Sequence, residues 1–571
     1  MENPEVAQVF EEIADLLEIQ GANPFRVRAY RTAARTIRDL GEPLAQICKD
    51  PDRKVEDLQG IGKDLAGKIV TILDTQDLPL RQELRGQVPA GLREMLTLPG
   101  LGPKRVQLLH VRLGIAGTED LRKAAEQHRI RELDGFGAKT EESILKALAG
   151  REASQRRVLL AEAKVYAEGI VRHLRETPGI GAVIVAGSYR RRQETVGDLD
   201  ILTTCRRPDA IMERFGSYSG VEEVLARGPT KMTVRLRSGM QCDLRVVPEK
   251  SYGAALQYFT GSKAHSIQLR RRAQLRGLLL NEYGIFRGRR FVAGRTEEEV
   301  YKAVGLPWIS PELREARDEI EKALEGRLPQ LIELSDLRGD LHMHTDATDG
   351  RASLEEMVAA AKKRGYAYIA ITDHSKRVTM ARGMDGARLR KHWQAIDRVA
   401  ATVKGMAVLK GVEVDILENG NLDLPDAVLK DADWVIASIH YGQNQTREQL
   451  TERLLNAIRN PHVSAIGHPT GRLIGKRPGY PVDMEAVFKA AADFGCLMEV
   501  NGQPDRLDLD DTAVMAAKER GVRFVLDTDA HAVEELGFME FAIYQARRGG
   551  LEAKDVANTR TLAQLRKMLK R

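Results

Sequence analysis

Cysteine is scarce in this sequence. The four cysteines, Cys48, Cys205, Cys242 and Cys496, stand alone and show no paired spacing. This argues against a disulfide framework or a cysteine-based zinc site, and it is typical of a protein from a reducing cytoplasm. The sequence also has no run of about 18 apolar residues and no signal peptide, so we expect neither a membrane span nor secretion.

Positive charge is in excess only in the first part of the chain. The 571 residues carry a formal charge of +6. Residues 1–335 hold 54 Lys and Arg against 48 Asp and Glu, whereas the remainder holds 34 of each. Nucleic acid is therefore the expected partner of the basic portion. A chain of this length exceeds a single core, and about three to five domains are expected.

Residues 1–150 predict short helices that are interrupted by a glycine repeat. Each glycine pair follows a leucine and precedes a helix. Glycine lets the backbone approach a DNA phosphate, and the amides of the next helix then donate to its oxygens. An ordinary turn is the alternative for any single pair, but three pairs in register favour a DNA-binding element. The residues are Gly60, Gly62, Gly100, Gly102, Gly135 and Gly137.

From residue 151 the apolar runs at 183–186, 199–203, 232–236 and 242–247 predict an α+β fold. Asp198 and Asp200 share one face of a strand, and Asp243 lies on a strand that could pair beside it. Three carboxylates on one face need divalent cations, and their oxygen atoms favour Mg²⁺. Two such ions can activate a 3′-hydroxyl and stabilise a leaving pyrophosphate. A solvated strand edge is the alternative for a bare Asp-x-Asp.

After residue 336, apolar runs at 367–371, 408–412, 435–439, 464–467, 497–500 and 522–526 alternate with helical patterns. This predicts a parallel barrel or open sheet, in which the carboxyl ends of the strands converge on one face. Nine residues at these ends suit two or three ions of zinc, manganese or iron. They are His342, His344, Asp349, His374, Glu413, His440, His468, Asp529 and His531. Asp373 either orients His374 or caps a helix, and His392 and His462 are expected at the surface.

With these motifs, the chain resembles a bacterial family X DNA polymerase that carries a C-terminal PHP (polymerase and histidinol phosphatase) domain. All nine residues of the last region match the metal-ligand positions of the PHP family. The resemblance implies a multidomain chain with a helix-hairpin-helix region, a nucleotidyltransferase palm with a thumb, and a (β/α)7-like barrel. The implied domains are 1–85 (DNA-binding, lyase-like), 86–150 (fingers), 151–252 (palm), 253–317 (thumb), 318–335 (linker) and 336–571 (PHP).

The resemblance also implies roles for single residues. Nucleotide binding would involve Gly187, Ser188, Arg191, Tyr258, Phe259, Gly261, Lys263 and Ser266. Arg270 would touch the template strand. Lys68 matches the lysine that forms a Schiff base in lyase-active relatives, and a lysine that contacts a DNA phosphate is the alternative.

The expected function is that of a Mg²⁺-dependent polymerase, with catalytic Asp198, Asp200 and Asp243, which fills short gaps in base excision repair. The PHP domain would be a 3′-to-5′ exonuclease that uses Mn²⁺ or Zn²⁺. The expected partners are gapped or primed DNA and deoxynucleoside triphosphates, with a monomeric chain in the cytoplasm. The alternatives are a small-molecule phosphoesterase similar to histidinol phosphatase, and a DNA-binding scaffold with an inactive PHP domain.

Overall fold

The structure is a computed structural model that describes residues 3–40, 44–48, 53–58, 60–96, 98, 100–155 and 157–569. The chain divides into two compact units, residues 1–155 and residues 156–571. In the described part of the chain, no helix is both long and apolar enough to cross a membrane.

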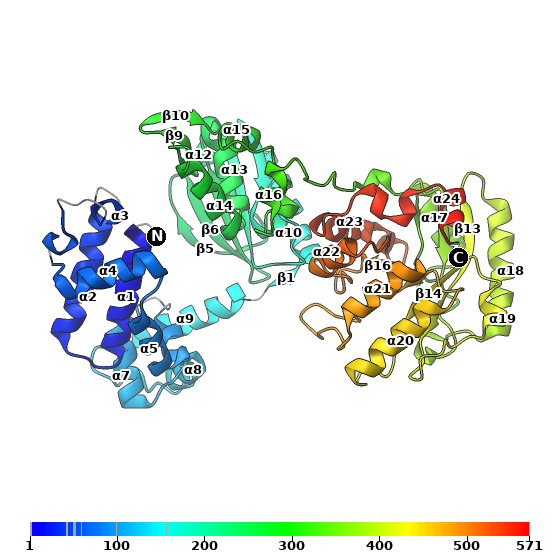
Figure 1. Cartoon of the computed structure of the whole chain (residues 1–571), viewed down its shortest axis with the longest axis horizontal. Helices are drawn as coiled ribbons and strands as arrows, with labels where there is room; N and C mark the ends of the chain where they lie inside the picture. The colour runs from blue at the N-terminus through cyan, green and yellow to red at the C-terminus, as the bar shows by residue number, and fades with distance from the viewer. Residues whose placement is uncertain are drawn as a thin grey trace. The chain divides into compact units, whose positions relative to one another are not determined.

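The first unit is helical throughout its described residues, as predicted (Figure 1). In α1 (Asn3–Ile19), apolar residues recur every three or four positions, and Val6, Phe10 and Ile13 are fully buried. This spacing gives α1 one apolar face, which packs against α2 (Pro24–Asp39). The other helices are α3 (Leu44–Ile47), α4 (Lys63–Thr75), α5 (Pro79–Gln87), α6 (Ala90–Met95), α7 (Pro103–Leu113), α8 (Thr118–Glu126) and α9 (Ala138–Gln155).

The second unit begins with a five-stranded sheet in the order β2-β4-β7-β6-β5. The four predicted strands correspond to β2 (Ile180–Val185), β4 (Asp198–Cys205), β6 (Lys231–Leu236) and β7 (Gln241–Val246). Only β4 and β7 pair in parallel. The fifth strand, β5 (Val221–Arg227), is not predicted. Most of its side chains are exposed, so the strand needs no apolar run that would reveal it in the sequence. The remaining elements are β1 (Val158–Leu159), α10 (Leu160–Arg175), α11 (Gly187–Arg190), β3 (Thr195–Val196) and α12 (Pro208–Gly216).

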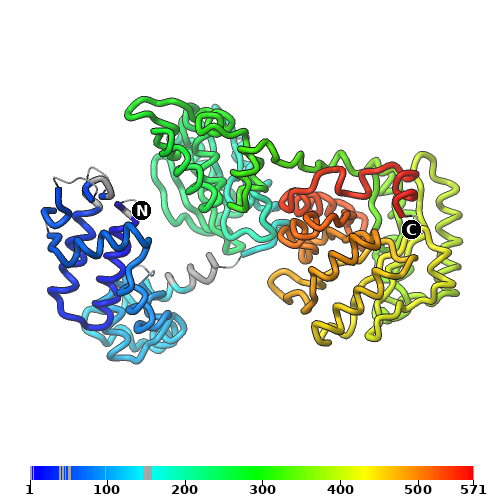
Figure 2. Tube along the Cα trace, in the orientation of Figure 1, coloured from blue at the N-terminus to red at the C-terminus, as the bar shows by residue number. Residues whose placement is uncertain are grey.

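A smaller α+β region follows the sheet. It contains α13 (Tyr252–Thr260), α14 (Lys263–Gln274), α15 (Glu297–Ala303) and an antiparallel sheet of β8 (Leu279–Asn281), β9 (Gly284–Arg287) and β10 (Arg290–Ala293). In α16 (Glu319–Leu324), Ile320 and Ala323 belong to the core of this region. The first part of the predicted linker is therefore packed against the thumb, whereas Ile332 near its end is buried in the core of the barrel; an irregular stretch joins the two (Figure 2).

The last region is a seven-stranded parallel sheet in chain order. Its strands are β11 (Gly339–Asp340), β12 (Tyr368–Ile371), β13 (Ala407–Asp415), β14 (Trp434–Ser438), β15 (Ala465–Ile466), β16 (Leu497–Asn501) and β17 (Phe524–Asp527). A parallel bridge between Met343 and Ala530 joins the two edges of the sheet at the carboxyl ends of β11 and β17, so the barrel is nearly closed. All six predicted strands are present. The sequence does not predict β11, which has two residues and no apolar run.

Helices connect the barrel strands along the chain. Of these, α20 and α21 pack side by side on the outside of the barrel (Figure 1). The helices are α17 (Leu354–Lys363), α18 (Gly386–Thr402), α19 (Asp426–Leu429), α20 (Arg447–Arg459), α21 (Met484–Phe494), α22 (Asp511–Glu519), α23 (Met539–Arg548) and α24 (Leu562–Leu569). The palm and the barrel share one hydrophobic cluster, in which Leu507 and Phe541 of the barrel region are buried with Ile170 of α10. The two regions are therefore joined by a common core.

Candidate functional site

Three aspartates lie together on one face of the palm sheet. The pairing of β4 with β7 places Asp200 directly opposite Asp243, and Asp198 shares this face because it precedes Asp200 by two residues. Burial and the charges of Asp198 and Asp243 raise the pKa of Asp200 to about 7. Burial and Asp243 also raise the pKa of Asp198. These carboxylates oppose one another's ionisation, and divalent cations that prefer oxygen ligands, such as Mg²⁺, fit the donor set.

Two basic side chains partly balance Asp243. Lys231 Nζ lies 2.9 Å and Arg245 Nη2 lies 3.5 Å from Asp243 Oδ2. The side-chain nitrogen of Gln241 donates to Asp243 Oδ1 at 3.4 Å. Motif reasoning does not predict the contacts of Lys231 and Arg245, because nothing in a short motif tells which neighbours on the same sheet face will reach the carboxylate.

The turn between β2 and α11 comes close to the three aspartates. Gly187 has a φ of 61°, and a Cβ atom at this position would lie 2.8 Å from Asp200 Oδ2. Both the backbone conformation and the available space therefore require glycine. Ser188 is the next residue of α11 and is half-buried. The predicted nucleotide-binding pair thus adjoins the aspartates.

Arg191 contacts the thumb region. Its Nε lies 3.0 Å from Glu315 Oε1, and its Nη1 donates to the Thr260 carbonyl at 2.5 Å. Its side chain is only 14% exposed. The guanidinium therefore has a fixed direction, which is set by residues that lie about 70 and 124 positions away in the sequence.

The predicted nucleotide residues of the thumb differ in exposure. Tyr258 is 39% exposed and packs edge-on against Phe259, with 5.1 Å between ring centroids. Gly261, with a φ of 69°, ends α13, and Lys263 is exposed at the start of α14. Ser266 is buried, and its hydroxyl lies 3.5 Å from the side-chain nitrogen of Gln257. The structure thus presents Tyr258 and Lys263 to solvent but not Ser266.

Arg270 lies one turn after Ser266 on α14. Its Nε donates to the Ser266 carbonyl at 3.4 Å, and the residue is exposed. The predicted contact between Arg270 and a template strand is compatible with this exposure and stays a prediction.

The three glycine pairs adopt one common hairpin, which confirms the repeat. The first glycine of each pair has a φ of 77°, 79° or 84°. The amide between the two glycines donates to the carbonyl of the preceding leucine at 3.0, 3.1 and 2.9 Å. A helix follows the second glycine, where an added Cβ atom would meet nothing within 4 Å. The backbone at Gly62, Gly102 and Gly137 is therefore open to an incoming group.

Arg105 joins the second and third hairpins. Its guanidinium donates to the Gly100 carbonyl at 2.8 Å and to the Gly135 carbonyl at 3.2 Å, and it lies 5.4 Å from the centre of the Phe136 ring. Arg105 lies three residues after the second glycine pair, in the first turn of α7. Its guanidinium binds carbonyls of the protein itself, so Arg105 holds the second and third hairpins at a fixed distance from each other.

Lys68 is held as a charged ammonium. Its Nζ donates to the Tyr30 hydroxyl at 2.8 Å and lies 2.5 Å from Asp64 Oδ2. Although burial opposes the shift, these two groups raise the pKa of Lys68. A Schiff-base lysine needs a neutral amine. The contacts therefore favour the phosphate-binding alternative over the lyase role.

All nine predicted ligands of the last region converge at the carboxyl ends of the barrel strands. Their side chains form three overlapping groups, each compact enough to hold an ion. The groups are His344, Asp349, His374 and His531; His342, His344 and Asp529; and His374, Glu413 and His440. His468 joins them through Glu413, because its Nε2 lies 3.0 Å from Glu413 Oε1.

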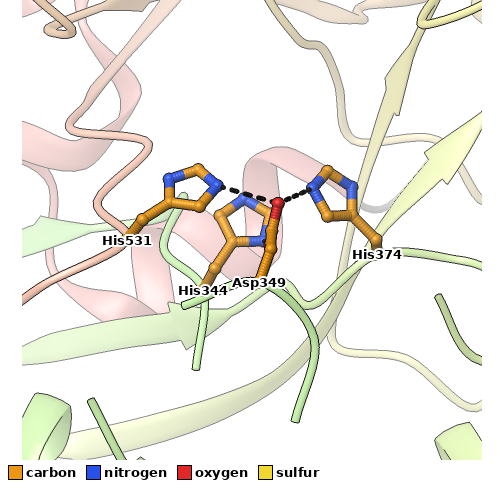
Figure 3. A group of neighbouring side chains, drawn as sticks. All are labelled: His344, Asp349, His374 and His531. Atoms are coloured by element: carbon orange, nitrogen blue, oxygen red, sulfur yellow. Dashed lines mark ion pairs between the residues drawn. The ribbon is translucent and has the colours of Figure 1, made fainter. Parts of the chain in front are cut away.

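The first of these groups surrounds Asp349 (Figure 3). Asp349 Oδ2 lies 3.3 Å from His374 Nε2 and 3.4 Å from His531 Nε2, and the rings of His344 and His531 stack with centroids 4.3 Å apart. The side chains of Asp349 and His531 are 33% and 28% exposed, whereas His344 is fully buried. Asp349 and His531 therefore form the solvent-facing rim of the site.

Glu413 lies at the centre of the array. Its two oxygens approach five imidazoles at 2.8–3.7 Å, from His342, His344, His374, His440 and His468. Burial alone would raise its pKa, but the charges of His440, His374 and His342 lower that pKa well below the usual range. An ionised carboxylate with imidazoles near both of its oxygens fits the donor set of a metal site.

The buried imidazole nitrogens fit a metal. His342 Nε2 and His344 Nε2 have no hydrogen-bond partner among the described residues, although carboxylate oxygens lie 3.2–3.7 Å from them. Despite burial, Glu413 and its neighbours raise the pKa of His374 to about 9 and that of His440 to about 10. Because a metal binds the neutral imidazole, metal binding would compete with protonation of these rings.

Two buried acids beneath the array are absent from the sequence prediction. Glu499 Oε1 lies 2.5 Å from His342 Nδ1, and Glu499 and Asp527 form a further compact group with His342. Such a contact fixes the tautomer and the orientation of a metal-binding imidazole. Their positions in β16 and at the end of β17 are the available signal, because the predicted ligands also follow strands.

The expectation that His392 lies at the surface is wrong. Its side chain is only 10% exposed, and its Nε2 lies 2.8 Å from Asp373 Oδ2. Asp373 also accepts hydrogen bonds from Thr345 and Thr348, which are in the loop between His344 and Asp349. Asp373 therefore orders the loop that carries two ligands. His462 is partly exposed and takes no part in the array.

Family models match four segments of the chain. The DNA polymerase beta thumb matches residues 255–315. A helix-hairpin-helix domain matches residues 1–78, and a SAM-like helix-hairpin-helix tandem matches residues 92–149. The PHP domain matches residues 340–501. These segments contain the three hairpins, the predicted nucleotide-binding residues of the thumb and seven of the nine barrel ligands.

Curated relatives match either the whole chain or a part of it. The DNA polymerase/3′-5′ exonuclease PolX of Bacillus subtilis (strain 168) is 38% identical over 100% of both chains. A probable phosphatase of Thermoanaerobacter sp. (strain X514) is 34% identical over 38% of this chain and 89% of its own length. A probable phosphatase of Acetivibrio thermocellus is 33% identical over 35% of this chain and 81% of its own length.

Proposed function

Because the chain belongs to the family X DNA polymerases that carry a PHP domain, we propose that it fills short gaps in DNA during base excision repair. DNA polymerase and 3′-to-5′ exonuclease are the activities named for its full-length Bacillus relative. We assign synthesis to the palm aspartates and 3′-end degradation to the barrel ligands.

The pairing of β4 with β7 is the observation that carries the polymerase assignment. It brings Asp198, Asp200 and Asp243 to one face and raises the pKa of Asp200 to about 7. These residues would hold two Mg²⁺ ions. When bound, the ions would promote ionisation of the primer 3′-hydroxyl and stabilise the leaving pyrophosphate. Lys231 and Arg245 limit the charge on Asp243 before the ions bind.

The substrate contacts follow from the neighbouring elements. Gly187 and Ser188 adjoin Asp200, and the exposed Tyr258 and Lys263 stand on α13 and α14. These residues, with Arg191, would hold the deoxynucleoside triphosphate. The open backbone of the three hairpins would contact DNA phosphates, which provides affinity without reading the base sequence.

The barrel ligands would hold two or three Mn²⁺ or Zn²⁺ ions. When bound, the ions would activate water and polarise the phosphodiester. Glu413 and His344 are buried at the base of the site, whereas His440, Asp349 and His531 are partly exposed. The 3′ end of DNA would therefore approach at the exposed rim. Glu499 keeps His342 in one orientation, and Asp373 keeps the loop of His344 and Asp349 in place.

Polymerase activity is tested by extension of a 5′-labelled primer at a one-nucleotide gap with Mg²⁺ and deoxynucleotides. Asp200→Asn should abolish extension, because the substitution removes a charged ligand but keeps the size of the side chain. Glu222→Gln, on the exposed face of β5, is the matched control and should extend normally. Equal extension by the two variants would rule out the assignment of the aspartates.

Exonuclease activity is tested by shortening of a 5′-labelled single strand with Mn²⁺ and no nucleotides. His344→Ala should stop degradation and lower the bound metal measured by mass spectrometry. His462→Ala, outside the array, should change neither quantity. Degradation by His344→Ala at the parental rate would assign the nuclease to another site.

The phosphatase relatives support a second candidate function for the barrel. They align over most of their own length with little more than a third of this chain. The same ligands would then remove a terminal phosphate. A single strand with a 3′-phosphate separates the two candidates: release of inorganic phosphate without shortening supports a phosphatase, whereas release of nucleotides supports the exonuclease.

A further inference from the structure

One helix of the barrel region contacts the palm residues that follow α11, the short helix that begins beside Asp200. Tyr544 of α23 stacks beneath the Arg192 guanidinium, with 4.2 Å from Arg192 Cζ to the ring centre. At the other end of the same contact, Lys164 of α10 lies 3.1 Å from Glu540 of α23. Phe541, between these two contacts, is buried in the cluster that the palm and barrel share. α23 is therefore part of the support of α11 and the residues that follow it.

The last residue of α23, Arg548, is buried and serves three acceptors. Only 4% of the residue is exposed. Its Nη1 donates to the Arg191 carbonyl at 2.8 Å and lies 3.1 Å from Glu315 Oε1, and its Nη2 lies 2.5 Å from Asp511 Oδ2. These partners belong to the palm, the thumb region and the barrel. A planar guanidinium can meet three acceptors in this arrangement, whereas a lysine ammonium is a single point charge on a flexible stem.

Glu315 connects Arg548 to the side chain of Arg191. Its Oε1 lies 3.0 Å from Arg191 Nε and 2.6 Å from the side-chain nitrogen of Gln193. With the bond from Arg191 Nη1 to the Thr260 carbonyl, two of the three guanidinium nitrogens of Arg191 are fixed. Both the main chain and the side chain of Arg191 thus depend on contacts that include Arg548.

We propose that Arg548, a residue of the barrel region, is a positioning residue for nucleotide binding at the palm. It holds the Arg191 carbonyl and shares the charge of Glu315, and together these contacts aim the Arg191 guanidinium at the triphosphate. The inference rests on the nucleotide role proposed above for Arg191. It makes nucleotide binding by the polymerase dependent on the barrel region, independently of the metal ligands of the barrel.

Loss of Arg548 has a defined direction of effect. Glu315 is only 13% exposed, so its charge needs a nearby cation. Without Arg548 on its other side, Glu315 attracts Arg191 more strongly, and the Arg191 carbonyl loses its donor. Both changes withdraw Arg191 from an incoming triphosphate. The expected result is weaker nucleotide binding with little change in the chemical step.

The test measures KM and kcat for a deoxynucleoside triphosphate during gap filling by the full chain. Arg548→Lys retains a positive charge beside half-buried Asp511 but replaces the planar guanidinium by a point charge, and Arg547→Lys is the matched control. Arg547 is the preceding residue of α23 and contacts Glu312 at 2.8 Å and Glu333 at 2.6 Å. Arg548→Lys should raise KM about tenfold, as expected for one lost hydrogen bond between charged groups, and change kcat less than about threefold. Arg547→Lys should leave both values near those of the parent.

A second substitution separates positioning from general damage. Glu315→Gln keeps an oxygen that can accept from Arg191 Nε but removes the charge that draws Arg191 away, so adding it to Arg548→Lys should return KM toward the parental value. Degradation of a single strand should be unchanged in all three variants, which shows that the barrel is intact. Equal KM values for Arg548→Lys and Arg547→Lys, or no recovery in the double variant, would overturn the proposal.

A separate variant tests the nucleotide role of Arg191 on which this proposal rests. Arg191→Gln should by itself raise KM for the nucleotide. If it does not, Arg191 has no nucleotide role and the proposed function loses that contact. If Arg191→Gln raises KM while Arg548→Lys does not, only the positioning role of Arg548 is wrong.

Discussion

At the residue scale, the palm and barrel sites balance their charges differently. In the palm, acidic side chains face one another, and the pKa of Asp200 rises to about 7. In the barrel, histidines surround Glu413 and Asp529, so the pKa values of these acids fall well below their usual range. The palm site therefore resists ionisation until cations arrive. The barrel site is already internally paired, and a metal must compete with protons.

The raised pKa of Asp200 predicts a pH-dependent stability. The unfolded chain releases this proton near pH 3.8 and the folded, metal-free chain near pH 7. Between these values the folded state holds the extra proton, so the free energy of unfolding falls as pH rises through this window. Asp200→Asn removes the free-energy cost of ionising this buried carboxyl in the folded chain. With a chelator present, the variant should exceed the parent by about 1–2 kcal/mol at pH 8 and by less at pH 5.

Urea unfolding at the two pH values measures this difference. Glu222→Gln, an exposed substitution in the same sheet, should show no such dependence on pH. A variant that is no more stable than the parent at pH 8 would show that burial and the neighbouring charges do not destabilise the ionised Asp200 carboxylate.

The contacts of Lys68 predict little lyase activity. Because Asp64 and Tyr30 raise the pKa of this lysine, few molecules carry the neutral amine near pH 7. Borohydride should trap little covalent complex with DNA that bears a 5′-deoxyribose phosphate, and Asp64→Asn should increase trapping by lowering that pKa. Efficient trapping by the parent chain, lost in Lys68→Ala, would restore the lyase role.

At the element scale, the hairpins and the strand ends place backbone and side chains where the chemistry needs them. The first glycine of each hairpin turns the chain, and the second leaves the backbone uncovered before a helix. In the barrel, consecutive parallel strands end at one face, so ligands that are up to 189 residues apart, such as His342 and His531, meet around Glu413 and Asp349.

The open second glycines predict a loss of DNA binding without a loss of stability. Gly62 and Gly102 have φ values of −84° and −79°, which alanine also adopts, and an added Cβ atom meets nothing within 4 Å. Gly62→Ala with Gly102→Ala should weaken binding to gapped DNA about tenfold, because each methyl group blocks the approach of a phosphate.

Fluorescence anisotropy at fixed salt measures this binding. Gly86→Ala, in α5, is the matched control because its Cβ atom also meets nothing within 4 Å. All variants should melt as the parent does. Unchanged affinity in the double variant would show that these hairpins do not contact the phosphates.

The sequence predicts those elements whose residues repeat a simple pattern. β12 and β17 are buried on both faces and appear as apolar runs, whereas exposed β5 and two-residue β11 do not. The ligands are predictable because most of them lie at or shortly after the carboxyl end of a strand. The burial of His392 cannot be predicted from the sequence, because it depends on how α18 packs against Asp373. The packing of α16 onto the thumb is likewise a tertiary contact hidden in a charged sequence.

At the scale of the whole molecule, synthesis and degradation are assigned to one compact unit. The palm and barrel share a hydrophobic cluster that includes Phe541, and they are joined by buried Arg548 and by a contact of 2.7 Å between Arg472 and Glu194. The two metal sites nevertheless use different residues. This separation predicts that each activity can be removed alone.

The most direct measurement follows one 5′-labelled primer at a gap, with Mg²⁺ and Mn²⁺, in the presence and absence of deoxynucleotides. The parent chain should lengthen the primer with nucleotides and shorten it without them. Asp200→Asn should only shorten the primer, and His344→Ala should only lengthen it. Loss of both activities in either single variant, or survival of both, would contradict the assignment of two independent metal sites in this chain.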